Sequence, residues 1–292
     1  MKKVAILGCE NSHANKFLGF IKDLPEFSDV EVVGVYSDER DAAEALAKRF
    51  NTTVLDNFDS AKGLVDGIII TARHGDNHLK YARPYIESGI PMFMDKPITI
   101  SEDEALELAE LLHKHNCPVT GGSSLAKEEF VCELAEDAKN LTDGKTVGGF
   151  IRAPLDNNEQ YGGFYFYAQH LSEMVMKIFG RYPNSVYATR CENQITVIFR
   201  YGDFDITGLF VVNNYVYYAA RFAEKSCKAR QLDLSKSQCF YTEFKMFYDL
   251  LEGGKQEMTY KDFIAPVFVM NAIDRSLASG KEEAVKRFTV NE

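Results

Sequence analysis

The sequence predicts an α/β protein with a doubly wound parallel sheet, followed by an α+β domain with a large, mostly antiparallel open sheet. Over the first 120 residues, short apolar runs alternate with helical patterns, which is typical of a parallel sheet covered by helices on both faces. Farther along the chain, polar turns separate successive strand patterns, as in hairpins. Because 292 residues exceed what one core usually supports, we expect two domains, 1–120 and 121–292.

The strands expected in the first domain are short, nearly continuous and rich in Val and Ile, as in a sheet that is covered on both faces. They are residues 3–8, 30–37, 66–72, 91–95 and 117–121, and the helices between them are 12–24, 39–50, 76–88 and 101–115. Ser101, with Glu104 three residues later, predicts a capping box at the start of the last of these helices.

In the second domain, "TVGGFIRAPL" predicts a strand and "FYFYAQHLSEMVMKIFG" a helix that ends at Gly180. "RYGDF" and "VNNY" indicate tight turns between later strands. These strands are expected at 185–192, 194–201, 204–212 and 215–222, and two closing helices at roughly 238–252 and 260–279. The helices cover one sheet face, so a second subunit is the simplest cover for the other, and we expect a homodimer or homotetramer.

The composition narrows the class of ligand. The net charge of −10 disfavours nucleic acid as a partner, and no apolar run reaches membrane-spanning length. The six cysteines include no C-x-x-C pair, so no metal site is indicated, and their scatter fits buried thiols in a reducing cytoplasm. We therefore expect a cytoplasmic protein that acts on a small molecule.

The stretch "GCENSHA" joins the first strand to the first helix, where a dinucleotide-binding loop reads G-x-G-x-x-G. Only Gly8 is in place, and Glu10 stands at the second glycine position. A carboxylate 4 Å from a phosphate would weaken the binding free energy of the dinucleotide by about 4 kcal/mol at an effective dielectric near 20, unless the side chain turns away. Two interpretations stay open: an anion site built from the helix N-terminus with Asn11 and Ser12, or a capped helix start that binds nothing. His13 could face either the site or the solvent, and a lone histidine is more often structural.

At the end of the second strand, the residue that holds the ribose hydroxyls is usually acidic. Here the stretch is "VYSDER", with Ser37 in that position, Asp38 beside it and Arg40 nearby. Arg40 favours a 2′-phosphate and Asp38 opposes it, so the choice between NAD and NADP is undecided. A strand-to-helix turn would also use Ser or Asp as a cap.

The stretch "MFMDKPITISEDEA" carries a sharper signal. An apolar strand ends in Asp95, Lys96 and a proline at the carboxyl edge of the sheet, where ligands bind in open α/β folds. The proline restricts the backbone at the lysine. A solvated surface lysine is the alternative.

In "YGGFYFYAQHLSEM", Tyr167, His170 and Glu173 are spaced to lie near one helix face. An aromatic run with one histidine is usually core packing, so this stretch alone favours a structural role.

Taken together, these stretches resemble the glucose–fructose oxidoreductase / inositol dehydrogenase / MocA (Gfo/Idh/MocA) family of NAD(P)-dependent oxidoreductases. The resemblance runs along nearly the whole chain, including "AIDRSLASGK". "DKP" is similar to the family's Glu-Lys-Pro, "HLSEMVMKIFG" resembles its His-x-x-Asp helix, and His78 lies eighteen residues before Lys96. The resemblance implies a Rossmann domain, then an α/β domain that pairs through a large open sheet.

The resemblance also implies roles. Lys96 would bind the substrate hydroxyl near the nicotinamide, His170 would be the general base or its partner, and the Lys96–Pro97 bond would be cis. Three features depart from the family pattern: the two missing loop glycines, Phe166, which replaces the acid one helical turn before the histidine, and the lengthened loop "TARHGDNH". Tyr167 could then serve as the proton relay instead, or orient the sugar. The residues that would lie along the cofactor at the carboxyl edge of the first sheet are Thr71, Ala72, Arg73, His74, Asp76, His78, Asp95 and Lys96.

The function expected is hydride transfer between NAD or NADP and a sugar, polyol or related hydroxy compound. A non-catalytic nucleotide- or sugar-binding protein is the alternative, because the loop has lost two glycines. A second alternative is an NAD-assisted lyase, hydrolase or epimerase, since such enzymes occur in the family that the chain resembles.

Overall fold

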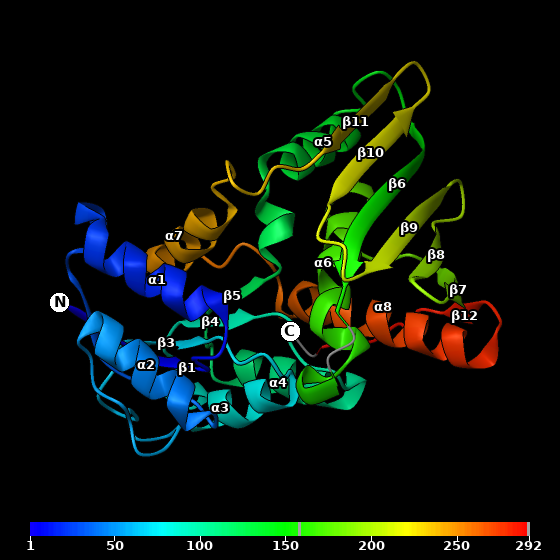
Figure 1. Cartoon of the computed structure of the whole chain (residues 1–292). Helices are drawn as coiled ribbons and strands as arrows, with labels where there is room; N and C mark the ends of the chain where they lie inside the picture. The colour runs from blue at the N-terminus through cyan, green and yellow to red at the C-terminus, as the bar shows by residue number, and fades with distance from the viewer. Residues whose placement is uncertain (157–158, 291–292) are drawn as a thin grey trace. The chain divides into compact units, whose positions relative to one another are not determined.

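The structure is a computed structural model that describes residues 1–156 and 159–290, and it divides into two compact units (Figure 1). Of the described residues, the first unit comprises Met1–Gly122, Phe240–Phe263 and Val290; the second comprises Ser123–Cys239 and Ile264–Thr289. Residues 240–263, which we expected in the second domain, instead belong to the first unit because their aromatic side chains join its core.

The first unit contains the predicted doubly wound parallel sheet, in the strand order β2-β1-β3-β4-β5. Its strands are β1 (Lys2–Leu7), β2 (Val30–Tyr36), β3 (Gly67–Ile70), β4 (Met92–Asp95) and β5 (Val119–Gly122). An isolated parallel bridge between Val35 and Val54 extends the sheet beyond β2. The chain reverses direction across the sheet between β2 and β3, so the carboxyl edge near β1 is the switch point where such folds bind ligands.

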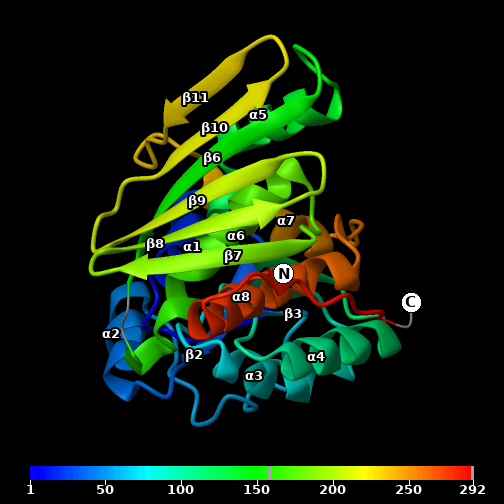
Figure 2. The ribbon, with the colours of Figure 1, turned by 90° about the vertical axis from the view of Figure 1, so that its right-hand side faces the viewer.

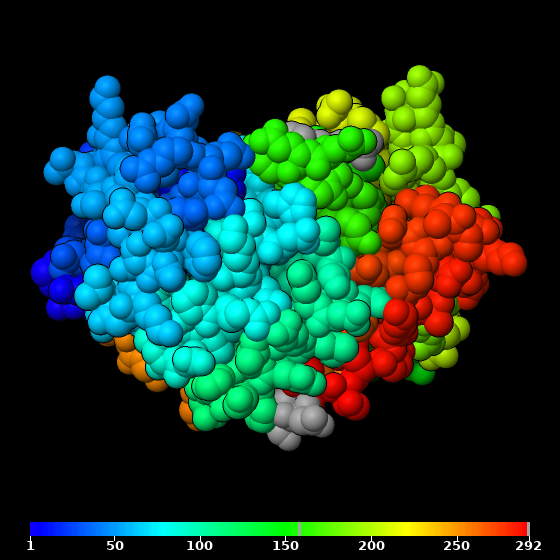
Figure 3. Space-filling view, turned by 90° about the horizontal axis from the view of Figure 1, so that it is seen from below, coloured from blue at the N-terminus to red at the C-terminus, as the bar shows by residue number. Residues whose placement is uncertain are grey.

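Helices cover both faces of this sheet. They are α1 (Ser12–Asp23), α2 (Arg40–Phe50), α3 (Asp76–Ile86), α4 (Glu102–Lys114) and α7 (Cys239–Leu251). Figure 1 shows α1 and α7 on one side of the strands and α3 and α4 on the other, the side that Figure 3 presents as a surface. Ser101 caps α4 by accepting from the backbone N–H of Glu104, as predicted.

The second unit is built on a seven-stranded sheet in the order β11-β10-β6-β9-β8-β7-β12, which is antiparallel except where β6 pairs with β9. Its strands are β6 (Thr146–Leu155), β7 (Ser185–Cys191), β8 (Gln194–Arg200), β9 (Asp205–Val212), β10 (Tyr218–Ala223), β11 (Cys227–Gln231) and β12 (Glu283–Ala284). Its helices are α5 (Glu129–Lys139), α6 (Phe164–Phe179) and most of α8 (Tyr260–Ser279). Short 3₁₀ turns lie at Ser124–Lys127 and Glu159–Tyr161 in this unit, and at Pro25–Phe27 in the first unit. The expected large, mostly antiparallel sheet is therefore confirmed.

The hairpin expected at "VNNY" is wrong. β9 and β10 are not partners, because β6 lies between them and pairs with both. Asn213 has a positive φ of 51°, which asparagine tolerates, and its N–H donates to the carbonyl of Leu155 at the end of β6. The polar turn carries the chain across a neighbouring strand instead of back along the same one.

One face of the second sheet packs on helices. α6 contacts β6 and β9, and α5 contacts β10; Figure 2 shows the sheet face-on, with α6 behind it. Side chains alternate along the strands: Val197 and Phe199 are buried, whereas Ile198 and Tyr187, paired across β7 and β8, point to the other face and stay partly exposed.

Within the described residues, we find neither a membrane-spanning helix nor a disulfide. No helix in this part of the chain is long and apolar enough to span a membrane. The cysteines form no disulfide there, and Cys191 and Cys227 are exposed rather than buried as the sequence led us to expect.

A buried charged cluster ties α7 to the first unit. His13, at the start of α1, lies between Asp95 and Glu243: its Nδ1 is 3.0 Å from Asp95 Oδ2 and its Nε2 is 3.3 Å from Glu243 Oε2. All three side chains are at most 4% exposed. Phe240 packs on the same imidazole, with ring centroids 4.9 Å apart.

The cluster makes His13 a cation. Burial by itself lowers the pKa of His13, but the charges and hydrogen bonds of Asp95 and Glu243 outweigh it and raise the pKa to about 9. Burial likewise raises the pKa of Asp95, and His13 with Lys96 brings it below its ordinary value. The imidazolium therefore offsets the desolvation of two buried carboxylates.

We expect the protein to lose stability as the pH rises from 6.5 through 9. A histidine whose folded pKa lies above its unfolded value stabilises the fold fully below 6.5, and this contribution disappears as the folded-state proton is lost. The pKa shift corresponds to about 3 kcal/mol. Urea unfolding at pH 6, 8 and 9.5 measures the loss, with His13→Gln as the matched variant. Parallel pH curves for the two proteins would contradict the assignment.

Candidate functional site

The carboxyl edge of the first sheet begins at Gly8, directly after β1. Its φ is +97°, and a Cβ placed there would lie 2.1 Å from the backbone nitrogen of Ala72. The hydroxyl of Thr71 donates to the carbonyl of Gly8 over 2.6 Å. Only glycine fits here, because the ends of β1 and β3 approach closely at this edge.

The direction of the Glu10 side chain is fixed by two hydrogen bonds. Its carboxylate accepts a hydrogen bond from Ser37 Oγ at 2.6 Å and one from the backbone N–H of Arg73 at 2.9 Å. Ser37 follows β2 and Arg73 follows β3, the two strands that flank β1. The carboxylate therefore spans the switch point of the sheet.

Asn11 and Ser12 form the start of α1. The Asn11 side chain caps the helix by accepting from the His13 N–H, and its amide nitrogen donates to Asp95 Oδ2 over 2.7 Å. Ser12 Oγ donates to Asn11 over 3.4 Å. His13 faces neither solvent nor an open site, since it lies in the buried cluster with Asp95.

Lys96 lies at the end of β4, where its side chain is 4% exposed. Its backbone N–H donates to Asp95 Oδ1 over 2.7 Å, and the Lys96–Pro97 bond is cis, as expected. Asp95 therefore holds two parts of the edge at once, the α1 cap through Asn11 and the backbone of Lys96.

At the end of β2, the two charged candidates already have partners. Asp38 accepts from the Tyr36 hydroxyl at 2.7 Å and from Lys80 Nζ at 3.1 Å. Burial raises its pKa, and these donors bring it below the ordinary value. Arg40 pairs with Glu44 along α2 and donates to a backbone carbonyl.

The loop after β3 is shaped by His78. Its ring is fully buried, and Nε2 lies 2.8 Å from the carbonyl oxygen of Ala72. Burial lowers the pKa of His78 despite this hydrogen bond, so the ring is neutral and its N–H holds the loop. His74 Nδ1 accepts from the backbone N–H of Asp76 on the exposed side of the loop.

In the second unit, α6 brings Tyr167, His170 and Glu173 to one face, as their spacing predicts. The rings of Tyr167 and His170 lie 5.3 Å apart. Ser123 links His170 to Glu173: its Oγ is 2.7 Å from His170 Nδ1, and its N–H donates to Glu173 over 3.0 Å. Phe166, in place of the family's acid, packs on Tyr161 and Tyr167.

Sequence reasoning missed Ser123 and Glu243. Ser123 directly follows β5 and gives no signal, because its partner on α6 is distant in sequence. Glu243 did offer one: it shares a helix face with Phe240, Phe244 and Phe247, and a carboxylate on an apolar face is expected only where it has a partner.

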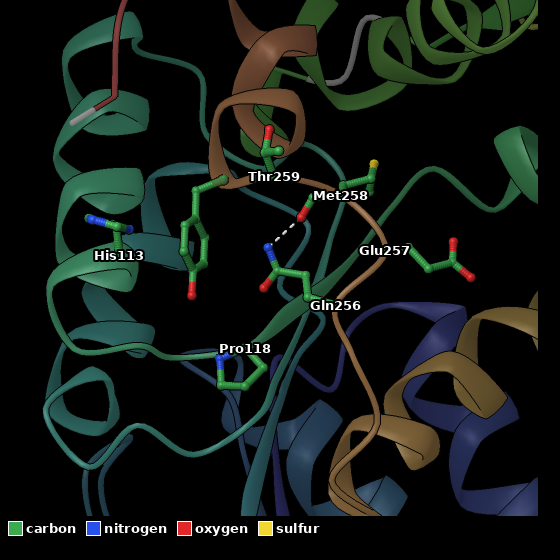
Figure 4. Close-up of a pocket in the computed structure, with 7 residues that line it drawn as sticks. His113, Pro118, Gln256, Glu257, Met258 and Thr259 are labelled. Carbon is green, nitrogen blue, oxygen red and sulfur yellow. Dashed lines mark hydrogen bonds between the residues drawn. The ribbon is translucent and has the colours of Figure 1, made fainter. Parts of the chain in front are cut away.

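Of the two cavities described in the first unit, one is lined by none of the candidate residues, and the other includes only Asp76 among them. One, of about 410 Å³, lies at the amino end of β5, where the segment before α8 meets α4 (Figure 4). Its wall is held by Gln256, which accepts from the Val119 N–H and donates to Met258. Another, of about 520 Å³, lies along α3 and is lined by Phe58, Asp59, Lys62, Asp76, Leu79, Lys80, Arg83, Pro84, Glu87 and Glu104.

The carboxyl edge fits a dinucleotide. Gly8 allows close backbone approach at the end of β1, and the N-terminus of α1 presents its amides and positive dipole end at the same edge. Glu10 is compatible because its carboxylate is turned to Ser37 and Arg73. Among the residues that the structure describes, no group of His, Cys, Asp or Glu could hold a metal ion.

The comparisons with known proteins agree with this architecture. Residues 2–123 match a family model described as the Gfo/Idh/MocA oxidoreductase family with an NAD-binding Rossmann fold. A search of curated proteins finds no match.

Solved structures of similar fold cover nearly the whole chain. One is a myo-inositol dehydrogenase from Corynebacterium glutamicum, with 17% identity and a TM-score of 0.81 over 99% of this chain and 100% of that one. Another is scyllo-inositol dehydrogenase from Lactobacillus casei with NAD(H) and scyllo-inositol, with 12% identity and a TM-score of 0.82 over 98% and 99%. A third is GenD2 from gentamicin A biosynthesis in complex with NAD, with 16% identity and a TM-score of 0.80 over 98% and 97%.

The family model and the shared fold confirm the resemblance drawn from the "DKP" and "HLSEM" stretches. The domain that carries the dinucleotide edge, residues 2–123, therefore matches the Gfo/Idh/MocA oxidoreductase family with its NAD-binding Rossmann fold.

Proposed function

We propose that this protein is a dehydrogenase that moves a hydride between a nicotinamide dinucleotide and a hydroxyl-bearing carbon of a sugar, cyclitol or other polyol. The observation that carries the proposal is Lys96: a buried lysine at the end of β4, on the same sheet edge as Gly8. The bound dinucleotide would supply the hydride acceptor. Gly8, Asn11 and Ser12 are the residues proposed to hold it, at the helix N-terminus.

Lys96 is assigned the developing negative charge on the substrate oxygen. A cation in a site with little water stabilises such a charge far more than in solution. Its backbone is held by Asp95 and the residue is buried, which limits how far the ammonium rearranges when the charge grows. This preorganisation favours the transition state over the bound substrate.

His170 is assigned the hydroxyl proton. Ser123 orients the imidazole through Nδ1 and also bonds Glu173, which gives the ring the fixed partner that Phe166 cannot provide. A neutral imidazole accepts the proton as the hydride leaves the carbon. Lys96 and His170 lie in different units, so their joint action on one substrate rests on the family resemblance and on the local surroundings of each.

Polyol oxidation tests the proposal. We expect Lys96→Met to lower kcat by about a thousandfold and to leave NADH binding within a factor of about three, because the lysine acts on the transition state. NADH formation at 340 nm with a panel of cyclitols and sugars gives the rate, and calorimetry gives the affinity. Lys48→Met, an exposed lysine of α2, is the matched control.

The outcomes separate the alternatives. Nicotinamide binding with no turnover of any polyol or sugar would favour the non-catalytic binding protein. Turnover without net NADH would favour a lyase, hydrolase or epimerase that returns the hydride. Equal loss of activity in both lysine variants would contradict the role of Lys96.

We also propose that the protein pairs through the free face of the second sheet. Ile198, Leu209 and Val211 on β8 and β9 are partly exposed there, and the exposed Tyr187 and Phe222 lie on β7 and β10. Open apolar patches of this kind usually mark an interface, and a self-complementary sheet face suits a symmetric dimer.

Light scattering at micromolar concentration is expected to give the mass of a dimer or tetramer. Ile198→Asp should shift it toward the 33.0 kDa monomer, because it places a charge in the apolar face without entering the core. Leu141→Asp, at an exposed leucine outside the sheet, should change nothing. A monomer mass for the unaltered protein would refute the pairing.

A further inference from the structure

Glu10 occupies an unusual place for an acid in a dinucleotide fold. It stands where the loop motif has its second glycine, yet its carboxylate bonds Ser37 at the end of β2 and the Arg73 N–H at the end of β3. Its backbone belongs to the phosphate-binding loop, whereas its charge lies beside the end of β2.

The end of β2 is where dinucleotide folds discriminate between NAD and NADP. An acid there accepts hydrogen bonds from the adenine ribose hydroxyls, and an arginine accommodates the 2′-phosphate. Here the position holds Ser37, which is neutral. Asp38 is engaged by Tyr36 and Lys80, and Arg40 is engaged along α2 by Glu44.

We propose that Glu10 replaces the missing acid: its carboxylate receives the ribose hydroxyls of NAD and excludes the 2′-phosphate of NADP. This inference rests on the proposed function, because it assumes that a nicotinamide dinucleotide binds at this edge. Glu10 has the geometry for it, with Ser37 and Arg73 fixing the carboxylate while each of its oxygens can accept further hydrogen bonds.

The electrostatics set the size of the effect. A 2′-phosphate near this carboxylate would be repelled, and Arg40, the cation at the start of α2, is directed to Glu44 and to the Leu55 carbonyl instead. At the dielectric of a partly buried site, one such repulsion lowers affinity by on the order of a hundredfold or more.

Calorimetric titration of the intact protein with NADH and with NADPH tests the inference without any turnover. We expect the unaltered protein to bind NADH about a hundredfold more tightly than NADPH. Glu10→Gln should bring the ratio within about tenfold, by weakening NADH and strengthening NADPH. Glu10→Ser should do the same, which guards against a defect peculiar to one variant. All titrations use one ionic strength, because screening changes the repulsion.

Asp38→Asn is the matched control, since it removes the neighbouring carboxylate from the same strand end. It should leave the ratio unchanged. Equal affinity for the two nucleotides in the unaltered protein, or a ratio that shifts with Asp38 and not with Glu10, would overturn the inference and leave the proposed function standing. Tighter binding of both nucleotides to Glu10→Gln would show that Glu10 obstructs the site. Binding of neither nucleotide to any variant would refute the proposed function as well.

Discussion

The carboxylate of Asp95 is fully buried at the end of β4, and the candidate site depends on it. One oxygen accepts from the backbone N–H of Lys96, and the other accepts from Asn11 and faces the His13 imidazolium. A buried carboxylate without such partners would cost several kcal/mol of stability, so these partners stabilise the folded state together. The strand end, the start of α1 and, through Glu243, α7 are held by one charge cluster.

This cluster also helps to fix the conformation of the loop after β1. A glycine-rich loop approaches the cofactor because it has no side chains in the way. Here only Gly8 keeps that function, and the other glycine positions carry side chains with defined partners. His13 is turned inward to the buried acids, and Glu10 is turned across the switch point to Ser37 and Arg73. The loop is held by hydrogen bonds and charge rather than by the absence of side chains.

Much of this could be predicted from the sequence, for reasons that are local. The strands of the first sheet are short apolar runs between amphipathic helices, and this alternation predicts a doubly wound parallel sheet. "DKP" marked the strand end, and the spacing of Tyr167, His170 and Glu173 placed them on one face. Other features depend on contacts between segments that are distant in the sequence. These are the direction of the Glu10 side chain, the pairing of His13 with Glu243, and the position of β6 between β9 and β10. Residue type and spacing carry no information about such contacts.

The most direct test is a crystal structure of the protein with NAD. The carboxyl edge of the first sheet is then expected to hold the dinucleotide, with the adenine ribose hydroxyls on the Glu10 carboxylate, the pyrophosphate at the N-terminus of α1 and the nicotinamide beside Lys96. The Asp95 carboxylate should keep its bonds to Asn11 and Lys96. A dinucleotide bound elsewhere, or one at this edge whose phosphates displace Glu10 and whose nicotinamide lies away from Lys96, would contradict a site organised by these two acids.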